Sequence, residues 1–159
     1  MAKRLLNGCV VVLATFFVPL SIILAAAGSY LISGFSEEAS QVDIDIRIPE
    51  VIVQREPFFV DVIVTNNAGY VQTLDDIDFN SDFLEAVEVV DTIPRFSRKT
   101  AIPFLVTYWF EREIQPSETL NVSLEMVARE PGTHLLLIGV CINVPSNCMN
   151  VDSMVVVTE

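Results

Sequence analysis

The sequence predicts one all-β sandwich domain behind a single N-terminal transmembrane helix. Two patterns in the 159 residues lead to this prediction. The first is an uncharged run of 28 positions, Leu5 to Ile32, near the N-terminus. The second begins at Val42: apolar and polar residues alternate with period two over a series of short segments, as half-buried strands require.

The N-terminal run is long enough to cross a bilayer, because a helix needs only about 20 apolar residues to span the hydrocarbon layer. Lys3 and Arg4 precede the run, and basic residues stay on the cytoplasmic side, so the C-terminal part is expected outside the plasma membrane. A cleaved signal peptide is the alternative, since Ala25 to Gly28 has small residues typical of a cleavage site. The predicted parts are a cytoplasmic N-terminus with its helix (1–35), a polar linker (36–41) and an extracytoplasmic immunoglobulin-like domain (42–159).

The predicted exported part carries the acidic charge of the chain. Residues 36–159 hold all 21 Asp and Glu but only seven Lys and Arg, a net charge of −14. Such a surface repels nucleic-acid phosphates and anionic lipid headgroups, so we expect no nucleic-acid partner. The chain is expected to meet the membrane as an integral protein, through its helix.

Eight short strands are predicted from the alternation. They cover Val42 to Ile48, Phe58 to Val64, Val71 to Phe79, Leu84 to Val90, Phe104 to Phe110, Leu120 to Met126, His134 to Ile142 and Met154 to Val157. Turn residues such as Pro131-Gly132 separate them, and this number and spacing of strands is typical of a β-sandwich. The stretch Asp82 to Val90 remains open, because FLEAVEVV is also compatible with a helical turn.

Three motifs add a resemblance to a known group of domains. Phe58 to Asn66 reads FFVDVIVTN, Ile114 to Thr119 reads IQPSET, and Ala128 to Gly132 reads AREPG. The pattern resembles the immunoglobulin-like modules of prokaryotic surface proteins, the CARDB and NEW3 group, in which V-x-N precedes P-G-E-T and a late A-x-x-x-G. Ser117 stands where glycine is commoner. The resemblance implies an immunoglobulin-like sandwich with adhesion, assembly or spacer roles and no catalytic residues.

Two cysteines flank a turn-rich segment near the C-terminus. Cys141 and Cys148 lie between two apolar runs, and in an exported domain this spacing predicts a disulfide that closes a hairpin or loop. The alternative is a Cu(I) site that adds Met149 and Met154 as soft ligands, which would make the protein a metallochaperone. The Cys-x-Cys spacing of copper chaperones and a histidine beside the pair are absent, so we expect no metal and no cofactor.

An acidic segment is the second candidate for ligand binding. Asp75, Asp76, Asp78 and Asp82 follow one another closely, and oxygen-rich loops bind Ca²⁺. The acids alternate with strand-like apolar residues and no EF-hand glycine follows, which favours a solvated strand face. The calcium interpretation requires this segment to be a loop that converges on one site.

The strongest candidate for a binding surface combines a tryptophan with a basic loop. Trp109 lies between Tyr108 and Phe110 in a predicted strand, so it should point away from the core. The loop Pro94 to Thr100 contains the only basic cluster of the predicted exported part: Arg95, Arg98 and Lys99. An exposed tryptophan beside positive charges on an acidic domain predicts the contact surface for a protein partner.

The sequence therefore favours a non-catalytic function. His134 is the only histidine, and no partner for acid–base or nucleophilic chemistry can be assigned to it. We predict an accessory subunit or protein-interaction module of a membrane assembly, whose partner is another membrane or surface protein. The alternative is an extracytoplasmic module that binds carbohydrate or calcium, and a metallochaperone ranks third.

Overall fold

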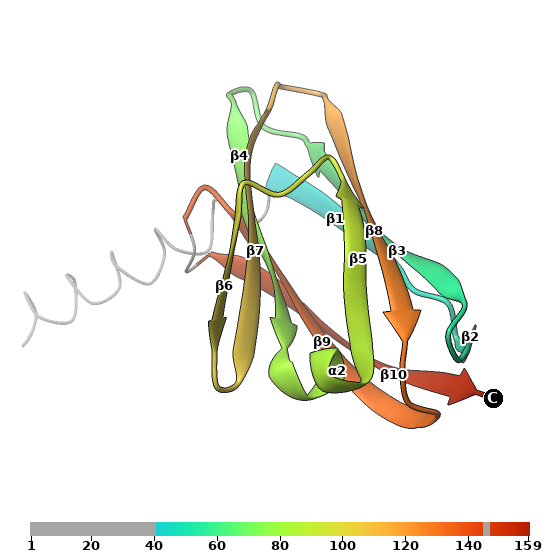
Figure 1. Cartoon of the computed structure of the whole chain (residues 1–159). Helices are drawn as coiled ribbons and strands as arrows, with labels where there is room; N and C mark the ends of the chain where they lie inside the picture. Colours follow the sequence, from blue (N-terminus) through green and yellow to red (C-terminus); the bar gives the residue numbers. More distant parts are fainter. Residues whose placement is uncertain (1–40, 145–146) are drawn as a thin grey trace, which may run out of the picture. The chain divides into compact units, whose positions relative to one another are not determined.

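The computed structural model describes residues 41–144 and 147–159 of the chain. Within them ten β-strands and one short helix are found (Figure 1). The strands are β1 (Val42–Arg47), β2 (Val51–Val53), β3 (Pro57–Asn66), β4 (Gln72–Asn80), β5 (Val87–Ile93), β6 (Arg98–Ile102), β7 (Leu105–Ile114), β8 (Thr119–Ala128), β9 (Gly132–Ile142) and β10 (Cys148–Thr158), and the helix is α2 (Ser81–Ala86).

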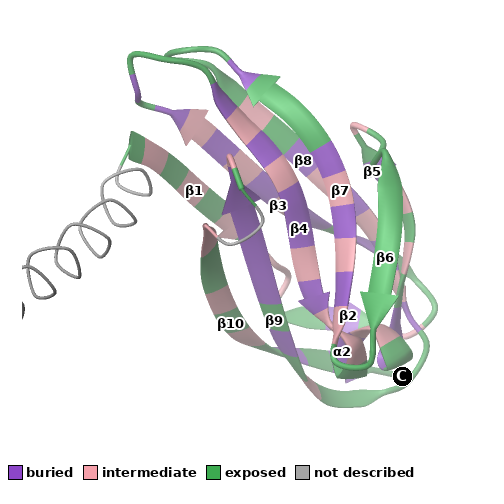
Figure 2. Cartoon of the chain, turned by 90° about the vertical axis from the view of Figure 1, so that its left-hand side faces the viewer, coloured by how far each residue is buried: buried purple, intermediate pink, exposed green. Residues whose placement is uncertain are grey.

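The strands form two sheets that pack face to face as a β-sandwich. The smaller sheet has the order β1-β3-β8-β5, and the larger one has the order β2-β10-β9-β4-β7-β6. Neighbouring strands are antiparallel except β2 and β10, which run parallel. Buried and less buried residues alternate along most strands (Figure 2), as the period-two pattern predicted. The all-β prediction is confirmed.

The core lies between the two sheets. On β3 and β8 most inward positions are fully or almost fully buried, whereas Leu120 at the start of β8 is partly buried. The matching positions of β4 and β7 close the other side, and the buried set is Phe58, Val60, Val62, Val64, Val122, Leu124, Met126, Leu74, Ile77, Phe79, Val106, Tyr108 and Phe110. One predicted inward residue is an exception, because Phe104 is 71% exposed. It lies in the two-residue turn between β6 and β7, so the strand and its alternation begin one residue later.

Two strands were not predicted, and one open assignment is resolved. β2 has three residues, too few to show alternation, and β6 is exposed at all five positions. Both are edges of the larger sheet, where one side of the strand needs no partner. The first part of the FLEAVEVV stretch is helical and the second part is a strand. The helix α2 ends at Ala86 and buries Phe83 and Ala86, and β5 begins at Val87.

Asn66, the last residue of the V-x-N motif, ties two loops together at one end of the sandwich. Its buried side-chain amide nitrogen donates to the carbonyl oxygens of Tyr70 and Ile114, both at 2.8 Å, and its side-chain oxygen accepts from the backbone N–H of Ala68. The N–H of Ser117 donates to the Asn66 carbonyl, and Ser117 adopts a φ of 66°. Two of the motifs behind the resemblance therefore meet in space and specify turn geometry.

The predicted fold class needs one correction. Among residues 41–144 and 147–159, no helix is long and apolar enough to cross a membrane. The helix α2 has six residues, about 9 Å of helix, whereas the hydrocarbon layer is about 30 Å thick. The part of the predicted fold class that the structure supports is therefore the all-β sandwich alone. The transmembrane helix was predicted within residues 1–35, which lie outside the described residues.

Candidate functional site

β6 forms an open edge of the larger sheet. It pairs with β7 from Arg98, opposite Trp109, to Ile102, opposite Leu105, and no other strand of the described residues pairs with its far side. All five residues of β6 are exposed, and the strand is green throughout in Figure 2. About half the backbone N–H and C=O groups of such an edge point away from the sheet, where they can pair with another chain.

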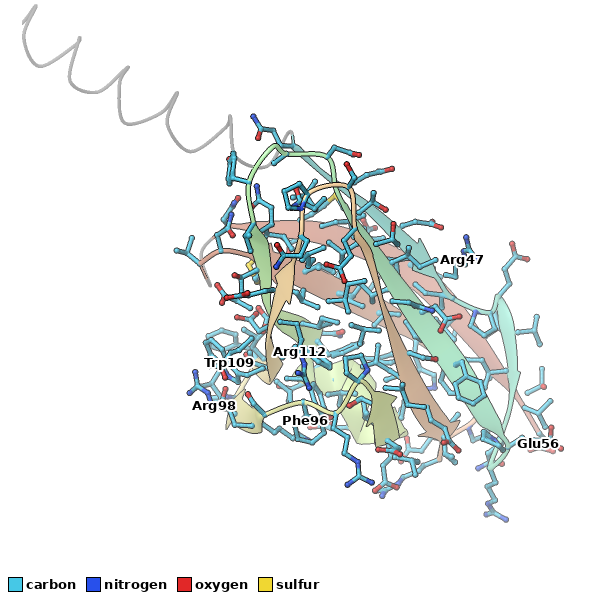
Figure 3. All side chains as sticks on the ribbon, turned by 90° about the horizontal axis from the view of Figure 1, so that it is seen from above. Arg47, Glu56, Phe96, Arg98, Trp109 and Arg112 are labelled. Atoms are coloured by element: carbon cyan, nitrogen blue, oxygen red, sulfur yellow. A yellow bond between two sulfur atoms is a disulfide. The ribbon has the colours of Figure 1, made fainter. Side chains whose placement is uncertain are left out.

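Trp109 and Arg98 lie together on the outer face of the larger sheet. The guanidinium carbon of Arg98 lies 3.8 Å from the centre of the Trp109 ring, and the two labelled side chains are adjacent in Figure 3. The indole Nε1 donates to Oγ1 of Thr100 at 3.1 Å, and Arg98 is 3.9 Å from Glu111. Trp109 therefore points away from the core, as predicted, but it is half-buried under Arg98.

Lys99 lies on the other face of β6, toward the gap between the two sheets. Its ammonium nitrogen is 4.9 Å from the centre of the Tyr108 ring, and it forms no ion pair within the described residues. Beside it is a pocket of about 210 Å³ between the edges β5 and β6, lined by Leu84, Val87, Glu88, Val89, Lys99, Tyr108 and Arg129. Glu88 and Arg129 form an ion pair at this pocket.

Arg95 is separate from this group. It lies before β6, with its side chain 86% exposed, and its Nε is 4.0 Å from the Asp91 carboxylate. The predicted basic loop is thus divided, because Arg98 and Lys99 belong to a strand whose alternation sends them to opposite faces. The structure brings Arg98 to Trp109 and brings neither Arg95 nor Lys99 into contact with it.

Sequence reasoning missed the apolar part of this edge. Ile102, the last residue of β6, is 49% exposed, and Phe104, in the turn that follows, is 71% exposed. Phe96 precedes β6 and stacks edge-on against Tyr108, with 5.2 Å between ring centres. The signal in the sequence was the Pro103-Phe104 pair, which interrupts the alternation and marks a turn.

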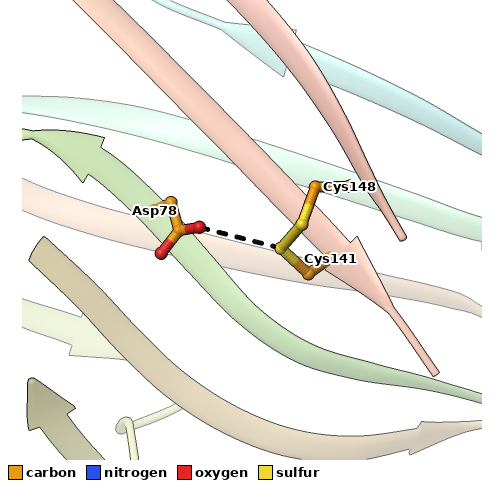
Figure 4. A group of neighbouring side chains, drawn as sticks. All are labelled: Asp78, Cys141 and Cys148. Carbon is orange, nitrogen blue, oxygen red and sulfur yellow. Dashed lines mark hydrogen bonds between the residues drawn. A yellow bond between two sulfur atoms is a disulfide. The ribbon is translucent and has the colours of Figure 1, made fainter. Parts of the chain in front are cut away.

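The predicted disulfide is confirmed. Cys141 of β9 and Cys148 of β10 are direct cross-strand partners with Cα atoms 4.0 Å apart, and their sulfur atoms are bonded (Figure 4). Oδ2 of Asp78 lies 3.8 Å from Sγ of Cys141. Because a disulfide sulfur has no proton to donate, this approach is a contact without hydrogen-bond character.

The soft-ligand set for copper does not converge. Asp78, Cys141 and Cys148 have potential ligand atoms within 4.8 Å of one another, but the two sulfurs are joined to each other and offer no thiolate. Met149 pairs with Val140 and Met154 pairs with Leu135, five residues apart along β10, so their side chains project to opposite faces.

The acidic segment is a strand and the start of a helix. Asp75, Asp76 and Asp78 belong to β4 and Asp82 belongs to α2, so the loop required by the calcium interpretation does not exist. Asp75 lies at a β-bulge between Leu74 and Asp76, and burial followed by the charge of Glu111 raises the pKa of Asp75 above its ordinary range.

Asp76 is the one residue of this segment in an unusual environment. It is 1% exposed, and neither carboxylate oxygen has a hydrogen-bond partner among the described residues. Burial is the largest cause that raises the pKa of Asp76 to about 7, followed by the negative charges of Asp78 and Asp75, while Arg98 lowers it. The sequence pattern could not show this burial, because the bulge shifts the register only in the folded sheet.

Comparison with known proteins supports the fold. The sequence matches no protein-family model and no curated protein. Among solved structures, AvmM, described as catalysing macrocyclization in alchivemycin A biosynthesis, is similar at 13% identity with a TM-score of 0.50 over 75% of this chain and 89% of that chain.

Two further similar structures have lower scores. They are the CARDB domain of the PF1109 protein of Pyrococcus furiosus, in complex with di-metal ions (11% identity, TM-score 0.42, 74% of this chain and 87% of that chain), and the cupredoxin domain of amoB from Nitrosocaldus yellowstonii (12%, 0.47, 74% and 87%). At these identities the likeness concerns the fold alone. The chain is a β-sandwich module.

Proposed function

We propose that this β-sandwich is a non-catalytic protein-interaction module that receives an extended acidic segment of its partner along the edge of β6. The observation that carries the proposal is the five-residue edge Arg98–Ile102, exposed at every position and open on one side. A partner strand at this edge would extend the larger sheet through main-chain hydrogen bonds.

The side chains of β6 favour the binding of a partner strand at this edge. Natural edge strands are commonly protected by charges, bulges or a covering segment. The two charges of β6, Arg98 and Lys99, lie at its start, and the remaining residues Thr100, Ala101 and Ile102 are uncharged. Ile102 and Phe104 add exposed apolar area at one end of the edge. The edge thus combines backbone pairing capacity with an apolar anchor.

Charge supports an acidic partner. The chain carries a formal net charge of −12, yet Arg98 and Lys99 begin the open edge. Arg98 already forms an ion pair with Glu111. Lys99 has no ion pair within the described residues and faces the pocket between β5 and β6. An acidic side chain of the partner strand would pair with Lys99, and this attraction would mainly increase the association rate at low salt.

The disulfide supports a location outside the cytoplasm. Disulfides persist in oxidising compartments and are rare where thiols are kept reduced. The pair Cys141–Cys148 therefore favours an exported domain, and the partner of β6 would be another membrane or surface protein. Within a membrane assembly the module would act as an accessory subunit.

Site-specific photo-crosslinking tests the proposal. A photoreactive amino acid at Thr100, in the cells that make the protein, should give a discrete crosslinked product, and mass spectrometry should locate the link in an acidic extended segment. The matched control is Asp45 on β1, an exposed position on an edge of the smaller sheet. Lys99→Glu should reduce the product several-fold, with the largest loss at low salt.

Two results would overturn the proposal. One is the absence of a crosslinked product at Thr100 while the domain remains folded. The other is a product of equal yield and composition from position 45, because that would show contact without preference for β6.

A further inference from the structure

The carboxylate of Asp76 is buried without a partner, and this is rare in folded proteins. Buried polar groups are nearly always hydrogen-bonded, and each exception needs a water, an ion or a functional reason. Asp76 is 1% exposed, and both of its oxygens lack a hydrogen-bond donor among residues 41–144 and 147–159. The fold therefore holds an acidic oxygen pair with unused coordination capacity.

Asp78 projects from the same face of β4 as Asp76, because the two residues are two positions apart in a strand. Oδ1 of Asp78 accepts a hydrogen bond of 2.6 Å from the Thr107 hydroxyl, which orients the carboxylate. Its other oxygen, Oδ2, lies 3.8 Å from the disulfide sulfur of Cys141, which has no proton to donate, so this oxygen can coordinate a ligand. Two carboxylates thus share one side of the sheet.

Gly139 allows the side chains of Asp78 and Asn150 to approach the backbone of β9 closely. It is the cross-strand neighbour of Asp78 on β4 and of Asn150 on β10. A Cβ atom at position 139 would lie 2.9 Å from Oδ1 of Asn150 and 3.8 Å from Oδ2 of Asp78. A side chain at position 139 would collide with Asn150, so glycine at this position lets the amide oxygen of Asn150 and the carboxylate of Asp78 approach the same point of β9.

We propose that Asp76, Asp78 and Asn150 bind a hard divalent cation, of which Ca²⁺ is the best match, on the outer face of the larger sheet. All three offer oxygen ligands, which Ca²⁺ prefers, and Ca²⁺ accepts carboxylate and amide oxygens together with water. The cation compensates the repulsion between two neighbouring carboxylates and supplies Asp76 with the partner that the protein does not.

The flanking residues suit such a site. Asp76 lies between Trp109 on β7 and Cys141 on β9, so an indole and a disulfide border it on either side. Both are poor competitors for a hard cation. Arg98, which stacks on Trp109, lies close enough to lower the pKa of Asp76, so a partner that engages Arg98 at the β6 edge would alter the charge near the site.

Terbium luminescence tests the proposal directly. Tb³⁺ replaces Ca²⁺ in oxygen sites, and Trp109, the only tryptophan of the chain, is the cross-strand neighbour of Asp76 and can sensitise its emission. Excitation of the folded protein should produce Tb³⁺ emission that saturates with one ion per chain and is displaced by Ca²⁺. Asp76→Asn and Asp78→Asn should each weaken binding at least tenfold, whereas Asp43→Asn, on β1 of the other sheet, should leave it unchanged.

A second variant keeps the test decisive if Asp76→Asn does not fold. Asn150 is exposed, so Asn150→Asp should fold normally, and its added charge should strengthen binding several-fold. The proposal is wrong if folded wild-type protein shows no sensitised emission up to about 1 mM Tb³⁺, the weak end of the range of extracellular calcium modules. It is equally wrong if emission persists in Asp78→Asn and does not change in Asn150→Asp, which would locate the ion elsewhere and leave Asp76 simply protonated.

Discussion

Arg98 stacks its guanidinium 3.8 Å from the ring centre of Trp109, across the pair that joins β6 to β7. The basic residue and the aromatic residue that the sequence suggested as two separate contacts for a partner are thus each other's contact. A partner that binds at this edge meets a composite surface in which the cation covers the indole. The features of the edge that remain open to a partner are the backbone of β6, Lys99 and the apolar residues at its end.

Removal of the guanidinium should expose the indole without unfolding the domain. We expect Arg98→Ala to shift the fluorescence emission of Trp109 to longer wavelength and to increase its quenching by acrylamide. A cation–π contact at an exposed site contributes only about 0.5 to 1 kcal/mol, so stability should change little. Arg95→Ala is the control, because Arg95 pairs with Asp91 and makes no contact with the indole. Equal quenching in both variants would contradict the stacked arrangement.

Asp76 should make the stability of the domain depend on pH. The folded-state pKa of about 7 lies above the ordinary value of 3.8, so between these values the unfolded chain loses a proton that the folded protein retains. Stability should therefore fall as pH rises from about 4 to 7 and then level off, with a total effect of up to about 4 kcal/mol. Stability falls with rising pH because the folded state favours the protonated form of Asp76, and at higher pH folding has to hold this group protonated or bury its charge.

Asp76→Asn should abolish this dependence. In urea unfolding with a chelator present, the variant and the wild type should have similar stability near pH 4, and the variant should be more stable at pH 8. Asp43→Asn, at a position on the other sheet, should follow the wild-type curve. A variant that parallels the wild type across the whole range would show that Asp76 titrates normally.

Asn66→Ala should destabilise the domain strongly. The substitution removes three side-chain hydrogen bonds and leaves the carbonyl oxygens of Tyr70 and Ile114 without this donor. Loss of buried partners of this kind costs about 3 kcal/mol in total, measurable as a lower urea midpoint. Asn121→Ala, at an exposed position of β8, should change stability by no more than about 0.5 kcal/mol.

Ser117→Gly should stabilise the domain. Ser117 has a φ of 66°, a left-handed conformation that costs a residue with a Cβ about 1 to 2 kcal/mol. Glycine removes that cost but gains more freedom in the unfolded chain, so the expected net gain is about 0.5 to 1 kcal/mol. Ser123→Gly, in the extended strand β8, should instead lower the melting temperature. A loss of stability in Ser117→Gly would show that the serine side chain contributes a contact of its own.

The alternation of apolar residues was enough to predict the central strands. Val60, Val62 and Val64 on β3 and Val122, Leu124 and Met126 on β8 occupy the buried positions that their spacing indicated, because a strand sends alternate side chains to opposite faces. The spacing of Cys141 and Cys148 likewise predicted their bond, since two residues that flank a short turn are brought opposite each other by the hairpin. These features depend on neighbours along the chain, so the sequence by itself determined them.

The tertiary structure decided what depends on residues far apart in the sequence. β6 is a strand only because β7 pairs with it, and no hydrophobic pattern marks an edge whose residues are all exposed. Asp76 is buried only because the bulge at Leu74/Asp76 and the registers with β7 and β9 bring it between Trp109 and Cys141. Asn150 reaches the vicinity of Asp78 only across Gly139, two strands away in the sheet. Sheet registers are set by long-range backbone pairing, and a local pattern does not contain that information.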